Sequence, residues 1–438
     1  MTTDLLFALL ALPVAVSGQV RNLSMAECQR MAASRDPQTR SDSLSGEASA
    51  LQERSLASAW KPSVNASLSY NRLSELDPSG IDLPFPAAMG GPRKMVISPD
   101  IPNQYGATLR VDQLLWDGGR NSRQRGSARH EREAWGAARE KNGRELASKV
   151  AVAYWNLGAA QAALEAAKRA GARADSQATL AVASFRQGTA LEQDTLQARL
   201  RTRQIELSIE QAQASREFAL QTLQVAMGEP LALDCRASDP LEPLAPIPAQ
   251  PDAERPELRQ AREQILSAQE GLEASRAGYW PVVQASAQYD IQNPNQRMVP
   301  AHDAFDATWR VGANATWNLY RGGADDLAVR RSALAIQQAR LRETALGDAI
   351  GQEVLRRGTE LRLARRRRGI AERNLPLARR DLELAVLRSQ AGTALRLEAI
   401  DRASALSQAE SDLAQAIASE NIAILNLSIA RGEAPRWK

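Results

Sequence analysis

The sequence predicts a mixed fold in which each chain contributes four transmembrane β-strands and several long coiled-coil helices. Three observations predict it. A unit of roughly 200 residues occurs twice in the 438-residue chain. Four short segments alternate polar and apolar residues, and two much longer segments, 119–188 and 323–392, carry few turn signals. We therefore expect two hairpin–helix repeats rather than ordinary globular domains.

The repeat is clearest at a double glycine. "QLLWDGGR" at 113–120 has its counterpart in "NLYRGGAD" at 318–325, and "LAVASFRQGTAL" at 180–191 matches "LAVLRSQAGTAL" at 384–395. Upstream, "WKPSVNASLSY" at 60–70 matches "YWPVVQASAQY" at 279–289. The duplication suggests the following segments: a signal peptide 1–18, an N-terminal equatorial segment 19–36, a first repeat 37–230, a proline-rich linker 231–255, a second repeat 256–434 and a tail 435–438.

The expected signal peptide rests on one apolar run. Residues 5–16, "LLFALLALPVAV", are too few to cross a bilayer as a helix, and "SGQ" follows as a cleavage site. Asp4 stands where a basic residue is usual in such signals. We expect no other stretch to form a transmembrane helix.

Four strands are expected, at about 62–71, 105–116, 281–290 and 309–320. In each of them apolar and polar residues alternate, which is the signature of a half-buried strand. A soluble sandwich gives the same alternation. A membrane barrel is favoured because the strands have the length of a tilted crossing and because Tyr or Trp recurs near the ends of the apolar face.

Four strands cannot close a barrel, and open strand edges do not occur in lipid. Several chains must therefore share one barrel. Two chains would give eight strands and a barrel filled by side chains, whereas twelve or more strands leave a channel. The geometry by itself suggests three or four subunits.

The two long segments predict helices of about 100 Å, the second interrupted only by Pro376. Each needs a return path, which helices over 37–59 and 189–228 would supply end to end in the first repeat. Leu and Ala recur at a seven-residue step in these return segments, as in a coiled coil with small knobs. A double glycine ends the strand before each long helix, at Gly118–Gly119 and Gly322–Gly323.

Composition excludes several classes of function. The net charge is only +4, and basic and acidic residues alternate, so we expect no nucleic-acid partner. The densest basic run, Arg365–Arg368, predicts a solvated helix face, with docking of an acidic partner as the alternative. No hydrolase, metalloprotease, P-loop or dinucleotide motif is present, so we expect no enzyme and no cofactor.

The remaining reactive residues are few. His130 and His302 each stand alone, so neither is expected to bind a metal. Cys28 and Cys235 do not form a disulfide framework, although an exported chain could pair them.

With these features the sequence resembles the TolC-like outer-membrane efflux proteins, the outer membrane factor family. The resemblance rests on the duplication, on "LLWDGG" and "NLYRGG", on the glycine–threonine turns near 188 and 392, and on "RPEL" at 255–258. The resemblance implies a homotrimer with a twelve-stranded barrel in the outer membrane and a twelve-helix tunnel in the periplasm. It further implies an exit duct for a tripartite efflux pump or type I secretion system, with an inner-membrane transporter and a periplasmic adaptor as partners. A periplasmic coiled-coil adaptor or scaffold is the alternative.

The resemblance also assigns site residues. The helix tips at Gly188–Thr189 and Gly392–Thr393 would face the inner membrane and contact the adaptor. The family's entrance carboxylates fall on Asp194, Glu398 and Asp401; Glu398 and Asp401 could equally be solvated surface charges. The family's locking arginine and tyrosine are replaced by Ala394 and Ser389, with Arg396 as a possible substitute.

Overall fold

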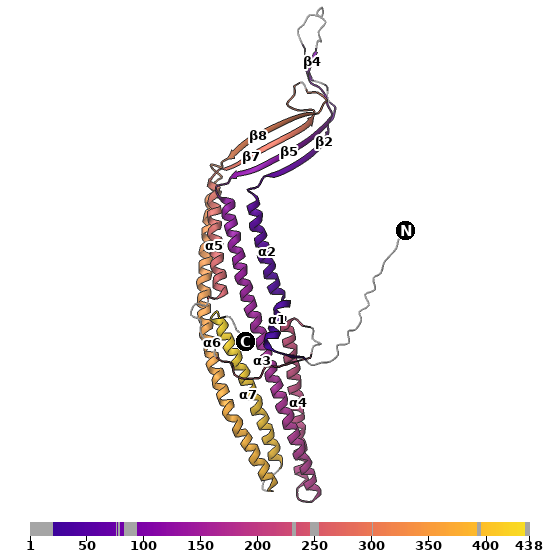
Figure 1. Cartoon of the computed structure of the whole chain (residues 1–438), viewed down its shortest axis with the longest axis vertical. Coiled ribbons are helices and arrows are strands. Elements are labelled where there is room, and N and C mark those ends of the chain that lie inside the picture. Colours follow the sequence, from indigo (N-terminus) through magenta and orange to yellow (C-terminus); the bar gives the residue numbers. More distant parts are fainter. Residues whose placement is uncertain are drawn as a thin grey trace, which may run out of the picture. The chain divides into compact units, whose positions relative to one another are not determined.

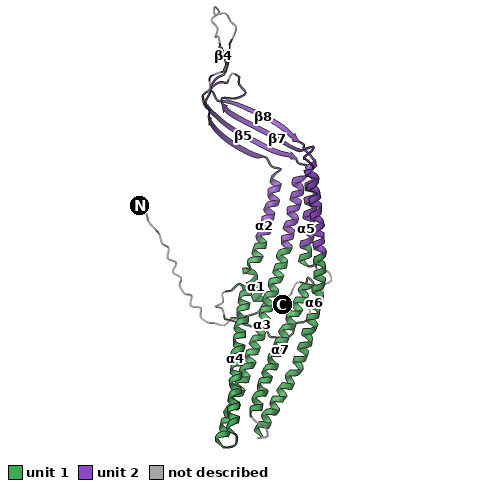
Figure 2. Ribbon diagram, turned by 180° about the vertical axis from the view of Figure 1, so that it is seen from behind, with its two compact units in different colours: residues 1–43, 137–259, 345–438 green, residues 44–136, 260–344 purple. Residues whose placement is uncertain are grey.

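The structure is a computed structural model of the whole chain. It describes residues 21–75, 77, 79–82, 94–229, 234–245, 254–299, 301–391 and 396–433. Two compact units make up the chain (Figure 2). The first, here called the tip unit, comprises 1–43, 137–259 and 345–438; the second, the sheet unit, comprises 44–136 and 260–344.

The sheet unit contains a four-stranded antiparallel sheet with the order β2–β5–β7–β8 (Figure 1). Its strands are β2 (Ser63–Arg72), β5 (Asn103–Trp116), β7 (Val282–Asn293) and β8 (Asp306–Thr316). The fourth strand ends four residues before the expected end at 320. Its partner β7 begins at Val282, opposite Thr316, and a 3₁₀ turn occupies Ala277–Tyr279, so no strand remains for 317–320 to pair with.

A second hairpin lies in the loop between β2 and β5. It is formed by β3 (Ser79–Asp82) and β4 (Lys94–Ser98), which pair antiparallel. Sequence patterning treats the whole stretch 72–104 as a loop, because these two strands are short and lack a clear alternation. The hairpin extends from the two strands at one edge of the larger sheet.

The helices follow the duplication closely. α3 (Arg120–Arg186) and α6 (Ala324–Gln390) are each 67 residues long, which corresponds to about 100 Å. The shorter helices are α2 (Pro37–Ser58) and α4 (Glu192–Met227) in the first repeat, and α5 (Pro256–Arg276) and α7 (Arg396–Ala430) in the second. α6 continues through Pro376.

Small side chains let the helices of the tip unit pack closely. One cluster joins Ala170, Ala174 and Ala181 of α3 to Ala198 of α4 and Ile400 of α7, all of them buried. α7 is long and apolar enough to cross a membrane by length and composition, contrary to the expectation from sequence. However, 61% of its most apolar window is buried inside the protein, as in a core helix.

The tip unit also holds a small equatorial core. β1 (Arg21–Leu23) pairs in parallel with β6 (Cys235–Ala237), and α1 (Met25–Arg35) packs on the end of α4. Tyr154 of α3 is fully buried there; its hydroxyl donates to Leu23 O and accepts from Asp239 N, both at 3.0 Å. These contacts attach the segments before and between the repeats to the long helix.

Candidate functional site

The turns between strand and helix require glycine. Gly118 and Gly119 have φ values of 70° and 83°, and Gly322 and Gly323 have 62° and 82°. Only glycine adopts this left-handed region without strain. At Gly118 an added Cβ would also lie 2.8 Å from Cβ of Trp280. The four predicted turn glycines therefore occupy positions where the backbone itself demands them.

An aspartate closes the first of these turns. Asp117 is buried, and its carboxylate accepts hydrogen bonds from Gly119 N (3.0 Å) and Asn121 N (2.8 Å). These bonds satisfy amides that the first turn of α3 would otherwise leave unpaired. The chain thus passes from sheet to helix within three residues.

One face of the sheet is polar and carries a connected network. Asp290 accepts from Thr108 Oγ1 (2.7 Å) and Gln288 Nε2 (2.8 Å), while Arg310 Nη2 donates to Gln288 Oε1 (3.0 Å). Arg110 Nε donates to both carboxylate oxygens of Asp112 at 2.9 Å. Polar side chains bonded to one another in these two groups suit the wall of a water-filled lumen.

The opposite face is apolar and exposed. Leu68, Trp309 and Val311 expose 87%, 70% and 69% of their surface. Aromatic pairs lie at both ends of the sheet: Tyr70 stacks near Tyr105, and Trp116 meets Trp280 edge to face at 6.0 Å. Such a band with aromatic ends fits the hydrocarbon layer and its two interfaces.

Among the residues that the structure describes, the outer strands β2 and β8 each pair on one side only. Their other edges present unpaired backbone groups, which cannot remain open in lipid. The apolar face and the open edges together mean that the sheet is a sector of a larger closed surface.

Exposed large apolar residues recur at seven-residue steps over parts of the helices. On α6 they are exposed in the structure of the described residues, and exposed residues at the same step also occur on α2 and on α4. The members on α6 are Leu327, Leu334, Leu341, Leu363, Ile370 and Leu377, and those on α2 and α4 are Leu44, Leu51, Leu200, Leu207, Phe218 and Val225. A seven-residue apolar step is the spacing of a coiled-coil seam.

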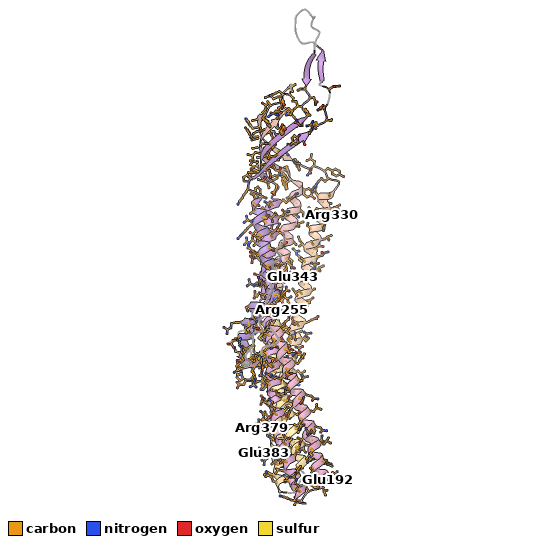
Figure 3. The ribbon with its side chains drawn as sticks, turned by 90° about the vertical axis from the view of Figure 1, so that its right-hand side faces the viewer. Glu192, Arg255, Arg330, Glu343, Arg379 and Glu383 are labelled. Carbon is orange, nitrogen blue, oxygen red and sulfur yellow. The ribbon has the colours of Figure 1, made fainter. Side chains whose placement is uncertain are left out.

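The first helix tip is a tight reversal. Gly188 has a φ of 72°, and Thr189 N and Oγ1 both approach Ser184 O at 3.0 Å, which closes the end of α3. Thr189 is exposed. Gly392 and Thr393, and Ala394 beside them, lie outside the described residues. Glu192 in the first turn of α4 and Glu383 of α6 add charge at this end of the tip unit (Figure 3).

The three entrance carboxylates have different surroundings. Asp194 accepts from Leu191 N (3.3 Å), so it caps α4. Glu398 lies 3.9 Å from Arg388 Nη1, and Asp401 lies 3.2 Å from Arg201 Nε. Each second-repeat carboxylate thus has an arginine neighbour that sequence reasoning did not foresee. Their role at an entrance stays a prediction.

Arg396 joins the two repeats near the tips. Its Nη2 donates to Ser184 Oγ at 3.1 Å, so the start of α7 is tied to the last turns of α3. A groove of about 800 Å³ lies near it between α3, α6 and α7, lined among others by Arg173, Leu382 and Glu383. The arrangement keeps the two helical hairpins of one chain together.

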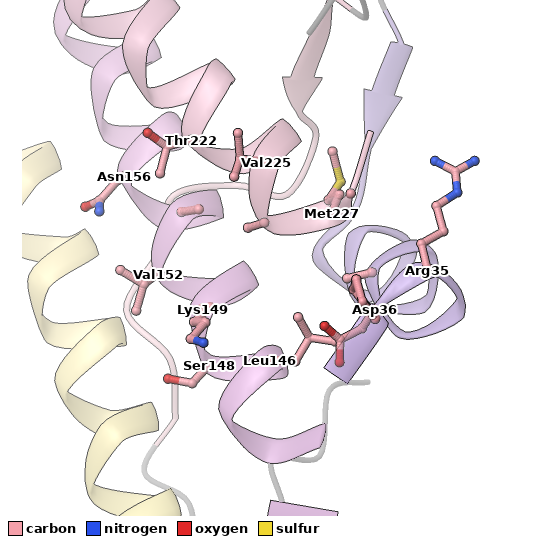
Figure 4. Close-up of a pocket in the computed structure, with 15 residues that line it drawn as sticks. Arg35, Asp36, Leu146, Ser148, Lys149, Val152, Asn156, Thr222, Val225 and Met227 are labelled. Atoms are coloured by element: carbon pink, nitrogen blue, oxygen red, sulfur yellow. The ribbon is translucent and has the colours of Figure 1, made fainter. Parts of the chain in front are cut away.

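A second groove, of about 570 Å³, lies beside the end of α4 (Figure 4). Leu146, Lys149 and Val152 of α3 and Val225 of α4 form part of its walls. Burial raises the pKa of nearby Asp36, but hydrogen bonds from Thr39 N and Oγ1 outweigh it and hold the pKa below its usual value. The mainly apolar lining suits packing rather than catalysis.

Sequence reasoning missed a buried ion pair within the tip unit. Glu420 of α7 is buried and accepts from Arg368 Nε, and Arg365 Nε lies 3.5 Å from it. The basic run 365–368 is therefore not simply a solvated face, since two of its members neutralise a carboxylate on the next helix.

Asn421, the residue after Glu420, holds the linker between the repeats in place. Its side chain accepts a hydrogen bond from Leu244 N and donates one to Glu242 O, each at 2.8 Å.

The reactive side chains singled out from the sequence are placed as follows. Cys28 and Cys235 are both buried and unpaired in the equatorial core. His130 Nδ1 lies 2.8 Å from Glu263, and His302 Nε2 lies 3.0 Å from Asp306. Within the described ranges, no three His, Cys, Asp or Glu side chains gather as a metal site would require.

Comparisons with known proteins agree with this geometry. A family model described as outer membrane efflux protein matches residues 29–229 and 248–433. No curated protein matches the sequence. Among solved structures, the Campylobacter jejuni CmeC outer membrane channel is 16% identical with a TM-score of 0.75, over 93% of this chain and 85% of that one.

Two further channels have the same fold. The open state of the Neisseria gonorrhoeae MtrE outer membrane channel is 19% identical with a TM-score of 0.74, over 94% of this chain and 89% of that one. The Vibrio cholerae outer membrane protein VceC is 17% identical with a TM-score of 0.71, over 94% and 96%.

A sheet with one lipid-facing side, open edges and paired long helices defines a subunit of an outer-membrane channel. The chain belongs to the outer membrane efflux protein family. It is therefore an efflux protein of the outer membrane, from a family of channels and not of enzymes. The predicted TolC-like fold class is confirmed.

Proposed function

We propose that three copies of the chain form one exit duct, with a shared twelve-stranded barrel in the outer membrane and a twelve-helix tunnel below it. The observation that carries this proposal is the four-stranded sheet with an exposed apolar face and two open edges. Pairing β8 of one protomer with β2 of the next removes every edge. Three copies give twelve strands, enough to leave a channel.

The exposed apolar residues at seven-residue steps support the same assembly. In a ring of protomers, those on α6 of one copy would face those on α2 and α4 of the next. Burying such residues contributes about 1.5–3 kcal/mol for each large side chain. The seam would run along the helices as it does in a coiled coil.

The helix tips are the proposed contact with the partners. The turns at Gly188 and at Gly392 would bind a periplasmic adaptor, which connects the duct to an inner-membrane transporter of a tripartite efflux or type I secretion system. Exposed residues at a tight reversal, such as Gln187 and Thr189, can enter a partner's groove without disturbing the helices.

Two experiments test this function. The expressed protein should stay in the membrane after a carbonate wash; release by the wash would point to the periplasmic scaffold alternative. A photo-crosslinker at Gln187 should capture a periplasmic adaptor protein, whereas one at Leu73, beside the sheet, should not. Capture only from Leu73 would show that the proposed orientation is reversed.

A further inference from the structure

The strand register places two arginines in one row across the polar face of the sheet. Asn65 lies opposite Arg110, Arg110 opposite Gln288, and Gln288 opposite Arg310. All four belong to the set of residues that alternates with the apolar face. In the proposed trimer, on which this inference rests, three-fold symmetry places three copies of Arg310 at one height of the barrel and three copies of Arg110 at another, about 6 Å away along the axis because the strands are tilted.

The two acidic residues near this row accept hydrogen bonds from other side chains of the sheet. Asp112, one row away, receives both of its bonds from Arg110. Asp290, one row away on the other side, is 9% exposed and accepts from Thr108 and Gln288. Asp112 is thus paired with Arg110, and the carboxylate of Asp290 is held in the wall, where 9% of the residue is exposed.

Arg310 differs from its neighbours. It is exposed, and its Nη2 donates a hydrogen bond to the neutral amide oxygen of Gln288. Among the described residues Arg310 forms no direct salt bridge, although its charge acts on Asp290 at longer range. A guanidinium in this state keeps donors for an anion.

We propose that the copies of Arg310 form a ring of guanidinium groups in the barrel lumen that binds anionic groups during passage, with Arg110 two strands away in support. The ligand class is a carboxylate, phosphate or sulfonate group, because guanidinium donors match two oxygens of such groups at once. Rings of arginine or lysine are also what selects anions in other pores.

The dimensions make such a ring effective across the whole lumen. Twelve strands about 4.8 Å apart, tilted by about 40°, enclose a lumen with about 24 Å between facing backbones. Electrostatic potential falls off over about 10 Å at 0.1 M salt and about 3 Å at 1 M salt. The electrostatic potential of the ring therefore reaches the centre of the lumen at 0.1 M salt and is screened there at 1 M salt.

The test uses the full-length protein in planar bilayers at 0.1 M KCl, with tripolyphosphate added on the barrel side. Arg310→Gln should raise the tripolyphosphate concentration for half block about tenfold, the effect of losing about 1.4 kcal/mol of binding free energy. It should also move the reversal potential in a KCl gradient towards cation preference. Arg310→Lys keeps the charge and should retain most of the block.

Arg54→Gln, an equal charge change at an exposed position on α2, is the matched control and should behave as wild type. In 1 M KCl the difference between Arg310→Gln and wild type should disappear. Channels of Arg310→Gln with unchanged block and reversal potential would overturn the arginine ring and leave the proposed duct intact. A wild-type protein that forms no channels would overturn both.

Discussion

Arg201 of α4 and Asp401 of α7 form an ion pair in which Nε and Oδ1 are 3.2 Å apart. The two side chains are about half exposed, at 48% and 45%, so the pair contributes at most about 1 kcal/mol to stability. Its consequence is electrostatic. Asp401, like Glu398 beside Arg388, has a cationic neighbour in its own chain, which reduces the charge it offers to an ion.

The entrance carboxylates give the first prediction. Glu398→Ala/Asp401→Ala should reduce cation preference and abolish block by a multivalent cation added on the helix side, because six carboxylates of the trimer are removed. Arg201→Gln should act in the opposite direction and strengthen that block by freeing Asp401. Both are measured in planar bilayers. If neither variant changes the block, Glu398 and Asp401 are surface charges.

The first double glycine gives a graded prediction. Both Gly118→Ala and Gly119→Ala force a left-handed φ on alanine, at a cost of about 1–2 kcal/mol. Only at Gly118 does the new Cβ also approach Trp280, at 2.8 Å; at Gly119 nothing lies within 4 Å. Gly118→Ala should therefore yield less folded protein in the outer membrane than Gly119→Ala. Equal yields would show that the close approach to Trp280 is relieved without cost.

The ion pair of Glu420 predicts that removing its two arginines costs more stability than neutralising the carboxylate. Arg365→Ala/Arg368→Ala leaves a buried carboxylate without its cations and should cost about 3 kcal/mol. Glu420→Gln should cost less, since the two arginines are partly exposed and can turn to water. Chemical denaturation in detergent, followed by circular dichroism, compares the two. A larger loss for Glu420→Gln would contradict this assignment.

The cysteines give a prediction about pH. Burial, with smaller contributions from Cys235 and nearby acids, raises the pKa of Cys28 to about 12. The thiol therefore stays protonated in the folded protein at pH 8, and a maleimide should react with it only after unfolding. The raised pKa also predicts that stability falls as the pH rises from about 9 towards 12, because the unfolded chain loses its proton first. Rapid labelling of the native protein at pH 8, or a disulfide that leaves no thiol after unfolding, would contradict the buried, free thiol.

The sequence predicts the local parts of the fold well. Strand alternation, the double glycines and the long turn-free segments are set by residues that are close together in the sequence. They can therefore be predicted without a structure. The ends of β8 and the presence of the β3–β4 hairpin are harder to predict from the sequence. The end of β8 depends on where its partner begins, which is a property of pairing between strands.

The sequence predicts only part of the candidate site, for the same reason. The alternating phase indicates that Arg110 and Arg310 lie on the polar face, but their common row depends on the register of β5 with β7 and of β7 with β8. Likewise, nothing near Arg368 in the sequence identifies Glu420, 52 residues away, as its partner. Charged residues on long helices look alike until the packing of the helices selects which of them meet.

The central claim is that three copies of the chain share one barrel. Native mass spectrometry of the protein, extracted from the membrane in mild detergent, tests it most directly. We expect a complex with three times the mass of one chain, which dissociates only in a denaturing detergent. A protein that remains a monomer, or one that assembles as a dimer, would contradict it, because neither leaves a twelve-stranded barrel around an open lumen.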